Sequence, residues 1–513
     1  VHMMKELTDE AFGLALRFGG VMSGEHGDGL QRSYLNERLF GPVLYGAMRE
    51  LKAAFDPSGL FNPGKVIDSG SPIENLRYGN KSAPYEIRTG LDWSIDGGFP
   101  QAVEMCNGQG VCRKLGEGIM CPSFMATRDE RDTTRARANA LRAVLSGRLG
   151  RDSLYSGEMY GVFDLCISCK ACKTECPSKV DAAKMKMEFL SHYHEKNGMS
   201  LRDRMFSDVH DASRAASLAP RLSNALIGNP ATKLLLSRLG IHPARTLPKL
   251  SGQSFTEWFY GRTKRAGTSG RKVVFFHDTW VTYYNPEVGK SAVELLEASG
   301  FEVMLVRERV CCGRPMLSKG MIGAARDRAL KNVSLLAPYV REGIPVVGTE
   351  PSCVLTFRDE YTDLLPGNKD ALLLASSSYM LTEFLNRVHR ESGLGIEWKA
   401  DTPEVLYHGH CHERSLAGVA DALGILAAAG CSVEESGAGC CGMAGSFGYE
   451  KEHYDISRAI GEDRLFPAVR NSAPEKVIAV SGVSCRHQIE HFCGRGVKHV
   501  AEVLAGLIKK DSR

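Results

Sequence analysis

A run of four closely spaced cysteines occupies residues 166–177: Cys166-Ile167-Ser168-Cys169-Lys170-Ala171-Cys172-Lys173-Thr174-Glu175-Cys176-Pro177. The spacing is C-x2-C-x2-C-x3-C-P, which is typical of [4Fe–4S] ligands, because two-residue spacers bring successive sulfurs onto adjacent irons. A zinc site is the alternative, since CxxC pairs also bind zinc. The fourth cysteine of such a run ordinarily serves a second cluster, so a second group of cysteines is expected.

A degenerate partner run lies upstream. Cys106 and Cys112 are followed by Cys121 before a proline, and Gln109 stands where a middle cysteine would be. By the two-cluster logic, Cys121 completes the group formed by the first three cysteines of the downstream run, and Cys176 joins Cys106 and Cys112. That second group lacks one thiolate. A three-iron cluster and a four-iron cluster with a non-cysteine ligand both remain open, as does a purely structural role for Cys106 and Cys112.

Residues 271–510 contain an internal repeat, in which short β-branched runs alternate with helical patterns. Strands are predicted at 273–276, 302–306 and 405–407, and helices at 290–299 and 416–429. The equivalent positions are Thr279 and Cys411, Cys312 and Cys441, and Cys353 and Cys485, offset by 132, 129 and 132 residues. Two consecutive α/β units are therefore expected.

The second unit carries four cysteines in a C-x28-CC-x43-C pattern: Cys411, Cys440, Cys441 and Cys485. This pattern resembles the cysteine-rich CCG domains of heterodisulfide reductase and of glycolate- and lactate-oxidising iron–sulfur subunits. The resemblance implies that these four cysteines bind an iron–sulfur cluster. The first unit keeps Cys311, Cys312 and Cys353 but has Thr279 in the leading position, so it is expected to be a degenerate copy.

Three histidines crowd the leading cysteine of the second unit: His408, His410 and His412. They could tune a cluster as hydrogen-bond donors, and an ordinary surface position is an equally open interpretation.

Two N-terminal motifs resemble the C-terminal domain of FAD-linked oxidases such as D-lactate dehydrogenase. The motifs are Ser23-Gly24-Glu25-His26-Gly27 with Arg32, and 55–65 with Asn62-Pro63-Gly64-Lys65. The resemblance implies that His26 takes the proton of a substrate hydroxyl, a task suited to imidazole near neutral pH. It also implies that Glu25 ligates a divalent metal such as zinc, and that Arg32, Asn62 and Lys65 belong to the cofactor site.

The chain is expected to be a multidomain α/β protein. The predicted parts are a truncated α+β flavin-oxidase piece (1–69), a linker (70–100), a mainly α-helical ferredoxin-type module (101–195), a helical connector broken by prolines (196–270), and two α/β CCG repeats (271–395 and 396–510). Seventy N-terminal residues with little periodic apolar surface would not fold well alone. An N-terminal partner is therefore expected, and the resemblance to FAD-linked oxidases implies that it is an FAD-binding domain or subunit.

The composition of the chain excludes some classes of protein. The 513 residues include 64 basic and 60 acidic side chains, which gives a net charge of +4. This charge balance does not indicate a nucleic-acid-binding protein. The 16 cysteines are clustered, and without a secretory signal they are more typical of metal ligands than of disulfides. No apolar run is long enough for a transmembrane span. We expect a cytoplasmic protein or a peripheral one at the inner face of the membrane; homo-oligomerisation stays open.

The order of the parts resembles that of fused bacterial FAD/iron–sulfur D-2-hydroxy-acid dehydrogenases, whose long FAD-binding domain is absent from these residues. The resemblance implies oxidation of a small 2-hydroxy acid of the D-2-hydroxyglutarate, D-lactate or glycolate class. Electrons would pass from FAD through [4Fe–4S] clusters to a quinone or an electron-carrier protein. Two alternatives are a heterodisulfide-reductase-like thiol–disulfide enzyme and a purely electron-transferring subunit.

Overall fold

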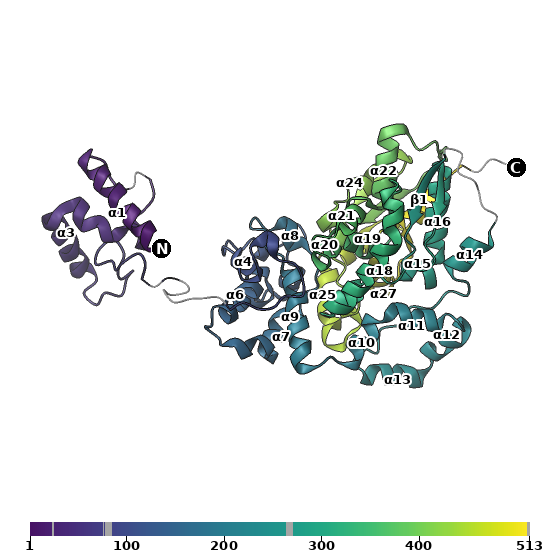
Figure 1. Cartoon of the computed structure of the whole chain (residues 1–513), viewed down its shortest axis with the longest axis horizontal. Helices are drawn as coiled ribbons and strands as arrows, with labels where there is room; N and C mark the ends of the chain where they lie inside the picture. The colour runs from purple at the N-terminus through teal and green to yellow at the C-terminus, as the bar shows by residue number, and fades with distance from the viewer. Residues whose placement is uncertain (23–24, 75, 77–84, 263–269, 510–513) are drawn as a thin grey trace. The chain divides into compact units, whose positions relative to one another are not determined.

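The computed structural model describes residues 1–22, 25–74, 76, 85–262 and 270–509. The chain forms two compact units, Val1–Tyr85 and Glu86–Arg513 (Figure 1). The boundary falls inside the segment predicted as a linker. Each unit is described by itself.

The first unit is helical in its described part, with α1 (His2–Arg17), α2 (Gly29–Arg32), a 3-10 turn (Ser33–Leu35) and α3 (Asn36–Phe55). Its core is small, and it exposes several large apolar side chains: Phe18, Val43, Phe55, Leu60 and Phe61. A water-soluble domain ordinarily buries more of such side chains, so this unit has apolar surface suited to a partner.

The second unit opens with a segment that packs against the rest of this unit. Residues 86–100 were predicted to be part of a linker, but Leu91 and Trp93 are buried. The Glu188 carboxylate accepts hydrogen bonds from the backbone N–H groups of Gly90 and Leu91 and from the Trp93 indole, at 2.7, 3.1 and 3.2 Å. A buried carboxylate needs such partners, which explains why the chain is fixed here.

Helices dominate the cysteine-bearing segment, as predicted. They are α4 (Phe99–Glu104), α5 (Pro122–Thr127), α6 (Thr134–Leu145), α7 (Gly157–Asp164), α8 (Ala171–Glu175) and α9 (Ala182–Asn197). Side-chain caps fix the two longest: Thr133 accepts from the Ala136 N–H at the start of α6, and Asp181 accepts from the Lys184 N–H at the start of α9. Short 3-10 helices in the second unit are Ser94–Asp96, Val111–Arg113, Glu130–Asp132, Arg151–Tyr155, Phe447–Tyr449 and Lys451–His453.

The connector is a series of short helices: α10 (Leu201–Ser207), α11 (Val209–Ala216), α12 (Pro220–Gly228), α13 (Pro230–Arg238) and α14 (Phe255–Gly261). Pro220 and Pro230 stand at the first residues of α12 and α13. They start these helices rather than breaking one long helix, because proline lacks only an N–H that is unpaired there.

Two four-stranded parallel sheets follow, with the orders β2-β1-β3-β4 and β6-β5-β7-β8. Their strands are β1 (Arg271–Phe275), β2 (Phe301–Met304), β3 (Val346–Gly348) and β4 (Ser378–Met380), then β5 (Glu404–His408), β6 (Ser432–Glu435), β7 (Val477–Val480) and β8 (Val497–His499). The identical strand order confirms the predicted pair of α/β repeats.

Helices of the first repeat are α15 (Thr279–Tyr283), α16 (Pro286–Ala298), α17 (Arg314–Ser318), α18 (Ile322–Arg341), α19 (Pro351–Arg358), α20 (Glu360–Leu364), α21 (Lys369–Ser376) and α22 (Leu381–Ser392). Those of the second are α23 (Cys411–Leu416), α24 (Ala420–Ala428), α25 (Tyr454–Asp463), α26 (Leu465–Asn471), α27 (Val483–Cys493) and α28 (Val500–Gly506). The helix predicted at 416–429 begins later, because Gly418 takes a left-handed conformation (φ +81°).

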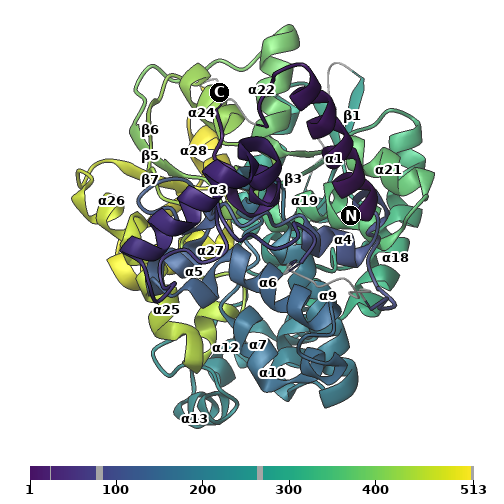
Figure 2. The same ribbon diagram turned by 90° about the vertical axis from the view of Figure 1, so that its left-hand side faces the viewer.

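The repeats share one core. Helix α16 of the first packs on α28 of the second, and α22 packs on α24, the equivalent pairing with the repeats exchanged. Figures 1 and 2 both show α22 beside α24. A single cluster of buried apolar side chains therefore includes Val273 and Phe275 of β1 together with Val405 and Tyr407 of β5. The shared core fixes the two repeats against each other and thereby positions the cysteines they carry.

Candidate metal centres

The first cysteine group combines two distant segments. Cys121, just before α5, lines a small cavity together with Cys166, Cys169 and Cys172 from the loop that leads into α8. These are the four residues that the sequence predicted to act together. The guanidinium of Arg137, which is 1% exposed, lies 3.5 Å from the Cys121 Sγ. A buried cation beside several sulfurs fits an anionic cluster.

Electrostatics also favour a metal in this cavity. Burial raises the pKa of the Cys169 and Cys172 thiols well above the ordinary value. Isolated thiols here would stay protonated, whereas coordination to iron removes the proton and offsets the cost of burial.

The second group lies around a separate small cavity, lined by Cys106, Cys112 and Cys176. Gln109 lines the same cavity, and glycines with left-handed backbone on either side of it (Gly108 and Gly110) shape the loop. The structure thus brings together the three cysteines that were paired by prediction. Asn107 lines this cavity too, so two amide side chains accompany the three cysteines.

Sulfur spacing bears on the zinc alternative. Zinc–sulfur bonds of about 2.3 Å place tetrahedral ligands less than about 4 Å apart. Within the described ranges, Glu450, Glu452 and His453 form the one group of three or more possible ligands whose atoms lie within 4.8 Å of one another. No three cysteine sulfurs of the described residues meet this limit.

The third group belongs to the second repeat. Cys411 begins α23, Cys440 and Cys441 follow β6, and Cys485 lies in the first turn of α27. All four are buried, and the hydrogen bond to Cys440, together with burial, raises the pKa of Cys411. The same argument therefore applies as for the first group: these side chains are suited to holding a metal as thiolates.

Gly442 shows why the CCG pattern needs its glycine. Its φ is +87°, and a Cβ at this position would lie 2.1 Å from the Ser457 carbonyl oxygen. Its N–H donates to the Cys440 Sγ at 3.4 Å. Only glycine allows the two adjacent cysteines to turn against this backbone.

The histidines around Cys411 are buried, so the surface interpretation was wrong. His408, His410 and His412 are 1%, 6% and 6% exposed. The His410 Nδ1 lies 4.0 Å from the Cys411 Sγ and also accepts the His412 N–H at 3.1 Å. The sequence could not show this, because burial depends on the cysteine-bearing segment that packs against α23.

Two hydrogen bonds join the third group to the first. The His412 Nε2 lies 3.0 Å from the Ser168 carbonyl oxygen, and the Ser415 hydroxyl donates to the Cys169 carbonyl at 2.9 Å. One buried cluster of side chains contains Cys121, Cys169 and Cys172 together with Cys411 and Cys440. Sequence analysis missed this connection, which links residues more than 240 positions apart.

The first repeat has the same scaffold with one ligand changed. Thr279 begins α15 as Cys411 begins α23, and each helix is capped by the side chain before it, Asp278 or His410. The Thr279 hydroxyl lies 2.9 Å from the Nδ1 of His210, which comes from connector helix α11. The leading position is therefore occupied by a hydroxyl already engaged with an imidazole, in agreement with a degenerate copy.

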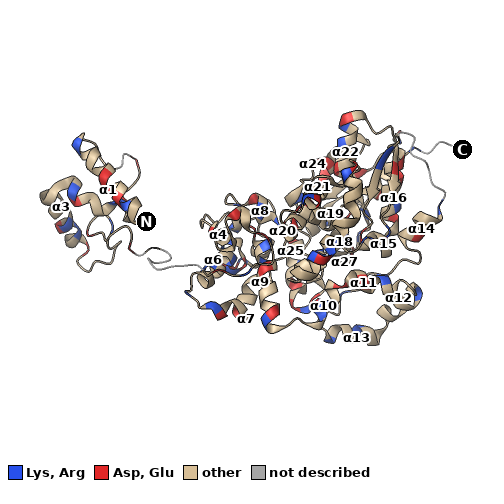
Figure 3. Cartoon of the chain, in the orientation of Figure 1, with Lys and Arg blue, Asp and Glu red and all other residues tan. Residues whose placement is uncertain are grey.

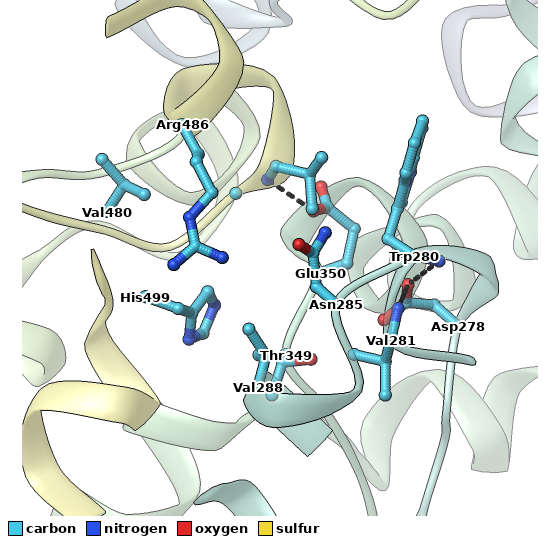
Figure 4. Close-up of a pocket in the computed structure, with 12 residues that line it drawn as sticks. Asp278, Trp280, Val281, Asn285, Val288, Thr349, Glu350, Val480, Arg486 and His499 are labelled. Carbon is cyan, nitrogen blue, oxygen red and sulfur yellow. Dashed lines mark hydrogen bonds between the residues drawn. The ribbon is translucent and has the colours of Figure 1, made fainter. Parts of the chain in front are cut away.

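A small pocket between the repeats is lined by residues of both. Figure 4 shows Asp278 and Glu350 reaching it from the first repeat, and Arg486 and His499 from the second. Burial and the neighbouring Glu350 carboxylate raise the pKa of Asp278 to about 7. Its Oδ1 accepts from the Trp280 N–H at 2.7 Å. The pocket thus places two carboxyl groups in the shared interface.

In the first unit, Ser23 and Gly24 lie outside the described residues, whereas Glu25, His26, Asn62 and Lys65 are exposed and Arg32 is half-buried. A hydrogen-bonding side chain holds the two motif loops near each other: the Asn36 Nδ2 donates to the Asp28 Oδ2 at 3.0 Å and to the Val66 carbonyl at 2.8 Å. The roles of these residues remain predictions.

Comparison with known proteins identifies the same types of domain in this chain. Residues 1–66 match the FAD linked oxidases, C-terminal domain; residues 105–181 match the 4Fe-4S dicluster domain; and 273–358 and 405–490 match the cysteine-rich domain. The C subunit of the anaerobic glycerol-3-phosphate dehydrogenase of Escherichia coli is 32% identical over 57% of this chain and 73% of that protein. The chain belongs to the same family as that protein.

Two other relatives match different shares of the chain. The D-2-hydroxyglutarate dehydrogenase of Escherichia coli is 28% identical over 99% of the chain and 53% of that enzyme. Lactate utilization protein A of Bacillus thuringiensis is 29% identical over 45% of the chain and 98% of that protein. The chain therefore spans about half the length of the dehydrogenases it matches. These findings confirm the predicted domain types and the association with iron–sulfur clusters and FAD.

Among the residues that the structure covers, no helix has both the length and the apolar character needed to cross a membrane.

Proposed function

We propose that this chain is the electron-relay portion, and part of the active site, of a flavin/iron–sulfur dehydrogenase that oxidises a D-2-hydroxy acid. The match over 99% of this chain, and 53% of the D-2-hydroxyglutarate dehydrogenase of Escherichia coli, supports the substrate class. The contact of His412 and Ser415 with the loop of the first cysteine group carries the relay proposal. It sets the cysteines of the second repeat beside those of the dicluster segment.

The proposed ligands follow from the three groups. Cys121, Cys166, Cys169 and Cys172 would hold one cluster; Cys106, Cys112 and Cys176 would hold a second; and Cys411, Cys440, Cys441 and Cys485 would hold a third. When bound, such clusters accept and release single electrons, so the two electrons of a flavin can leave one at a time. The chain's own contribution is to bury these sites, exclude water from them and place Arg137 against the first.

In the first unit, Glu25 would hold a divalent metal and the substrate, and His26 would accept the proton of the substrate hydroxyl. Asn62, Lys65 and Arg32 would face the FAD. We propose that an FAD-binding part beyond these residues completes the site, at the inner face of the membrane or in the cytoplasm. The acceptor would be external to the chain.

The test uses the chain joined to an FAD-binding part. Anaerobic addition of D-2-hydroxyglutarate, D-lactate or glycolate should reduce the clusters, detected by EPR. The substitution His26→Ala should abolish reduction by substrate and preserve reduction by dithionite. Equal substrate reduction in His26→Ala would contradict the active-site assignment and favour a purely electron-transferring subunit.

A further inference from the structure

The segment that matches the 4Fe-4S dicluster domain, residues 105–181, contains seven cysteines. Two clusters that are each held by four cysteines would need about eight thiolates. Cys121 and the first three cysteines of the downstream run make a complete set around their cavity. The cavity of the second group has only Cys106, Cys112 and Cys176 as cysteines in its described lining. The second group is therefore the one that lacks a thiolate.

Gln109 stands at the sequence position of the missing cysteine. Two residues separate it from Cys106 and two separate it from Cys112, so the stretch has the pattern C-x2-Q-x2-C. The downstream run has C-x2-C-x2-C, with Cys169 in the middle. Gln109 lines the cavity of the second group, as do Cys106 and Cys112. The chain therefore has an uncharged amide where the spacing predicts a thiolate.

The other described side chains around this cavity do not replace the missing thiolate. The described lining contains no histidine, aspartate or glutamate. The Asn107 Oδ1 accepts the backbone N–H of Gln109 at 3.1 Å, so this oxygen is engaged within its own loop. The Gln109 amide has no hydrogen-bond partner in the described part of the chain, so nothing holds its oxygen against a cluster. A fourth iron at this site would thus lack a fixed protein ligand.

The first and second groups also differ in their access to solvent. The four cysteines of the first group are all buried. In the second group Cys106 and Cys112 are buried too, but Cys176 is half-buried, and Asn107 and Gln109 are exposed. Water and small oxidants can therefore reach the second site from the side of this loop, whereas protein encloses the first site.

Helix α6 holds the loop of the second group in place (Figure 3). This helix carries three arginines and no acidic residue. The Arg135 guanidinium donates to the Gly108 carbonyl at 2.9 Å, and the Arg142 guanidinium donates to the Cys106 carbonyl at 2.7 Å. Both contacts are with the backbone, so the position of the loop does not depend on the side chain of Gln109. The positive charge beside the cavity also favours an anionic group inside it.

From these observations we infer that Cys106, Cys112 and Cys176 hold a cluster whose fourth iron is bound by solvent, so that this site takes up and releases one ferrous ion. The inference rests on the proposed cluster ligands and specifies the chemistry of one cluster. On release, one electron leaves [4Fe–4S]²⁺, which separates into [3Fe–4S]⁺ and Fe²⁺, and the electron reduces an oxidant such as dioxygen or ferricyanide. Uptake of Fe²⁺ with one electron from a reductant reverses the change.

The consequence is one oxidant-sensitive site in the relay. The three-iron and four-iron forms differ in type and charge, and these properties set the reduction potential of a cluster. Release of the fourth iron therefore changes electron transfer at the second site. The enclosed first site, with four cysteine ligands, keeps its iron under the same conditions.

The test uses the anaerobically purified, cluster-loaded chain. Ferrous ion and dithionite are supplied first, so that the fourth position is filled, and both are then removed. Oxidation by ferricyanide, followed by desalting, should remove about one iron per chain and produce the EPR signal of an oxidised three-iron cluster. Renewed addition of ferrous ion and dithionite should return the iron and remove the signal. Retention of all iron without a three-iron signal would overturn the inference.

Gln109→Cys locates the exchangeable iron. It completes the C-x2-C-x2-C spacing, so this variant should keep its iron and give no three-iron signal. Gln109→Ala is the matched control, because it changes the same exposed residue without adding a thiolate, and it should lose iron as the unaltered chain does. Iron retained in Gln109→Ala, or lost equally in Gln109→Cys, would overturn the inference.

Cys106→Ser provides a test that does not depend on the added cysteine. It removes a ligand of the second group, so it should abolish the three-iron signal. A signal that persists in Cys106→Ser would place the three-iron cluster elsewhere and overturn the inference. Iron content and EPR require no hydroxy-acid oxidation. Failure of the proposed function is therefore detected separately, as clusters that the substrate cannot reduce.

Discussion

The imidazole Nε2 of His412, one residue after Cys411, lies 3.0 Å from the carbonyl oxygen of Ser168, in the loop that carries Cys166 and Cys169. This contact fixes a cysteine of the second repeat against the dicluster segment. Burial lowers the pKa of His412 well below its usual range, so the imidazole stays neutral and its N–H can donate to the carbonyl.

The first prediction concerns the cluster of the second repeat. Cys411→Ser should remove that cluster and lower the iron content by about four per chain, and leave the EPR signal of the dicluster segment. Cys431→Ser is the control, because Cys431 is buried but lies outside the proposed group. A loss of iron in both variants, or in neither, would show that the ligand assignment is wrong.

The second prediction concerns the close approach at Gly442. Gly442→Ala combines left-handed backbone strain with a clash against the Ser457 carbonyl, so it should lower the free energy of unfolding by more than the strain of about 1–2 kcal/mol alone. Gly445→Ala isolates the strain, because Gly445 has φ +65° and no atom within 4 Å of an added Cβ. Denaturant unfolding measures both; equal losses would mean that the close approach does not matter.

The third prediction concerns a buried ion pair. The Lys170 ammonium, 2% exposed, pairs with the carboxylates of Asp359 and Glu360 and so anchors the cysteine loop to the first repeat. Lys170→Met removes one of two cations from each carboxylate, because Asp359 also pairs with Lys173 and Glu360 with Arg314, so it should cost about 1–3 kcal/mol. Lys179→Met, at an exposed lysine of the same segment, should cost less than about 0.5 kcal/mol. Thermal or denaturant unfolding would reveal an equal, small effect if the pair contributes nothing.

The fourth prediction concerns pH. The pKa of Asp278 is about 7 in the folded chain, above the ordinary 3.8. The folded state therefore holds a proton that the unfolded state has lost, and stability falls as the pH rises from about 4 to 7, by up to about 1.4 kcal/mol per unit. Asp278→Asn should remove this part of the slope and stabilise the chain above pH 7. The exposed Asp401→Asn should not change it. A wild-type slope in Asp278→Asn would contradict the assignment.

Local sequence patterns predicted much of this structure. The cysteine spacing anticipated that Cys121 joins the downstream run and that Cys176 joins Cys106, and the offsets anticipated two equivalent α/β repeats. The predicted helix ends differ from the observed ones where a single residue determines the end, as at Gly418. These features depend on spacing within short segments, which a sequence shows directly.

Features that depend on tertiary packing were not predicted. The burial of His412 depends on a loop more than 240 residues away, and residues 86–100 pack because Glu188 offers acceptors to their N–H groups. The connector carries no chemical motif, so its contribution to a cavity wall, through residues such as Met205, Phe206 and Leu247, becomes visible only in the structure.

The central claim is that three cysteine groups of this chain hold iron–sulfur clusters that relay electrons. Its most direct test is the iron and acid-labile sulfide content of anaerobically purified chain, with an EPR spectrum after reduction. The account predicts about eleven or twelve irons per chain, with matching sulfide and signals from interacting clusters. Zinc without labile sulfide would contradict it.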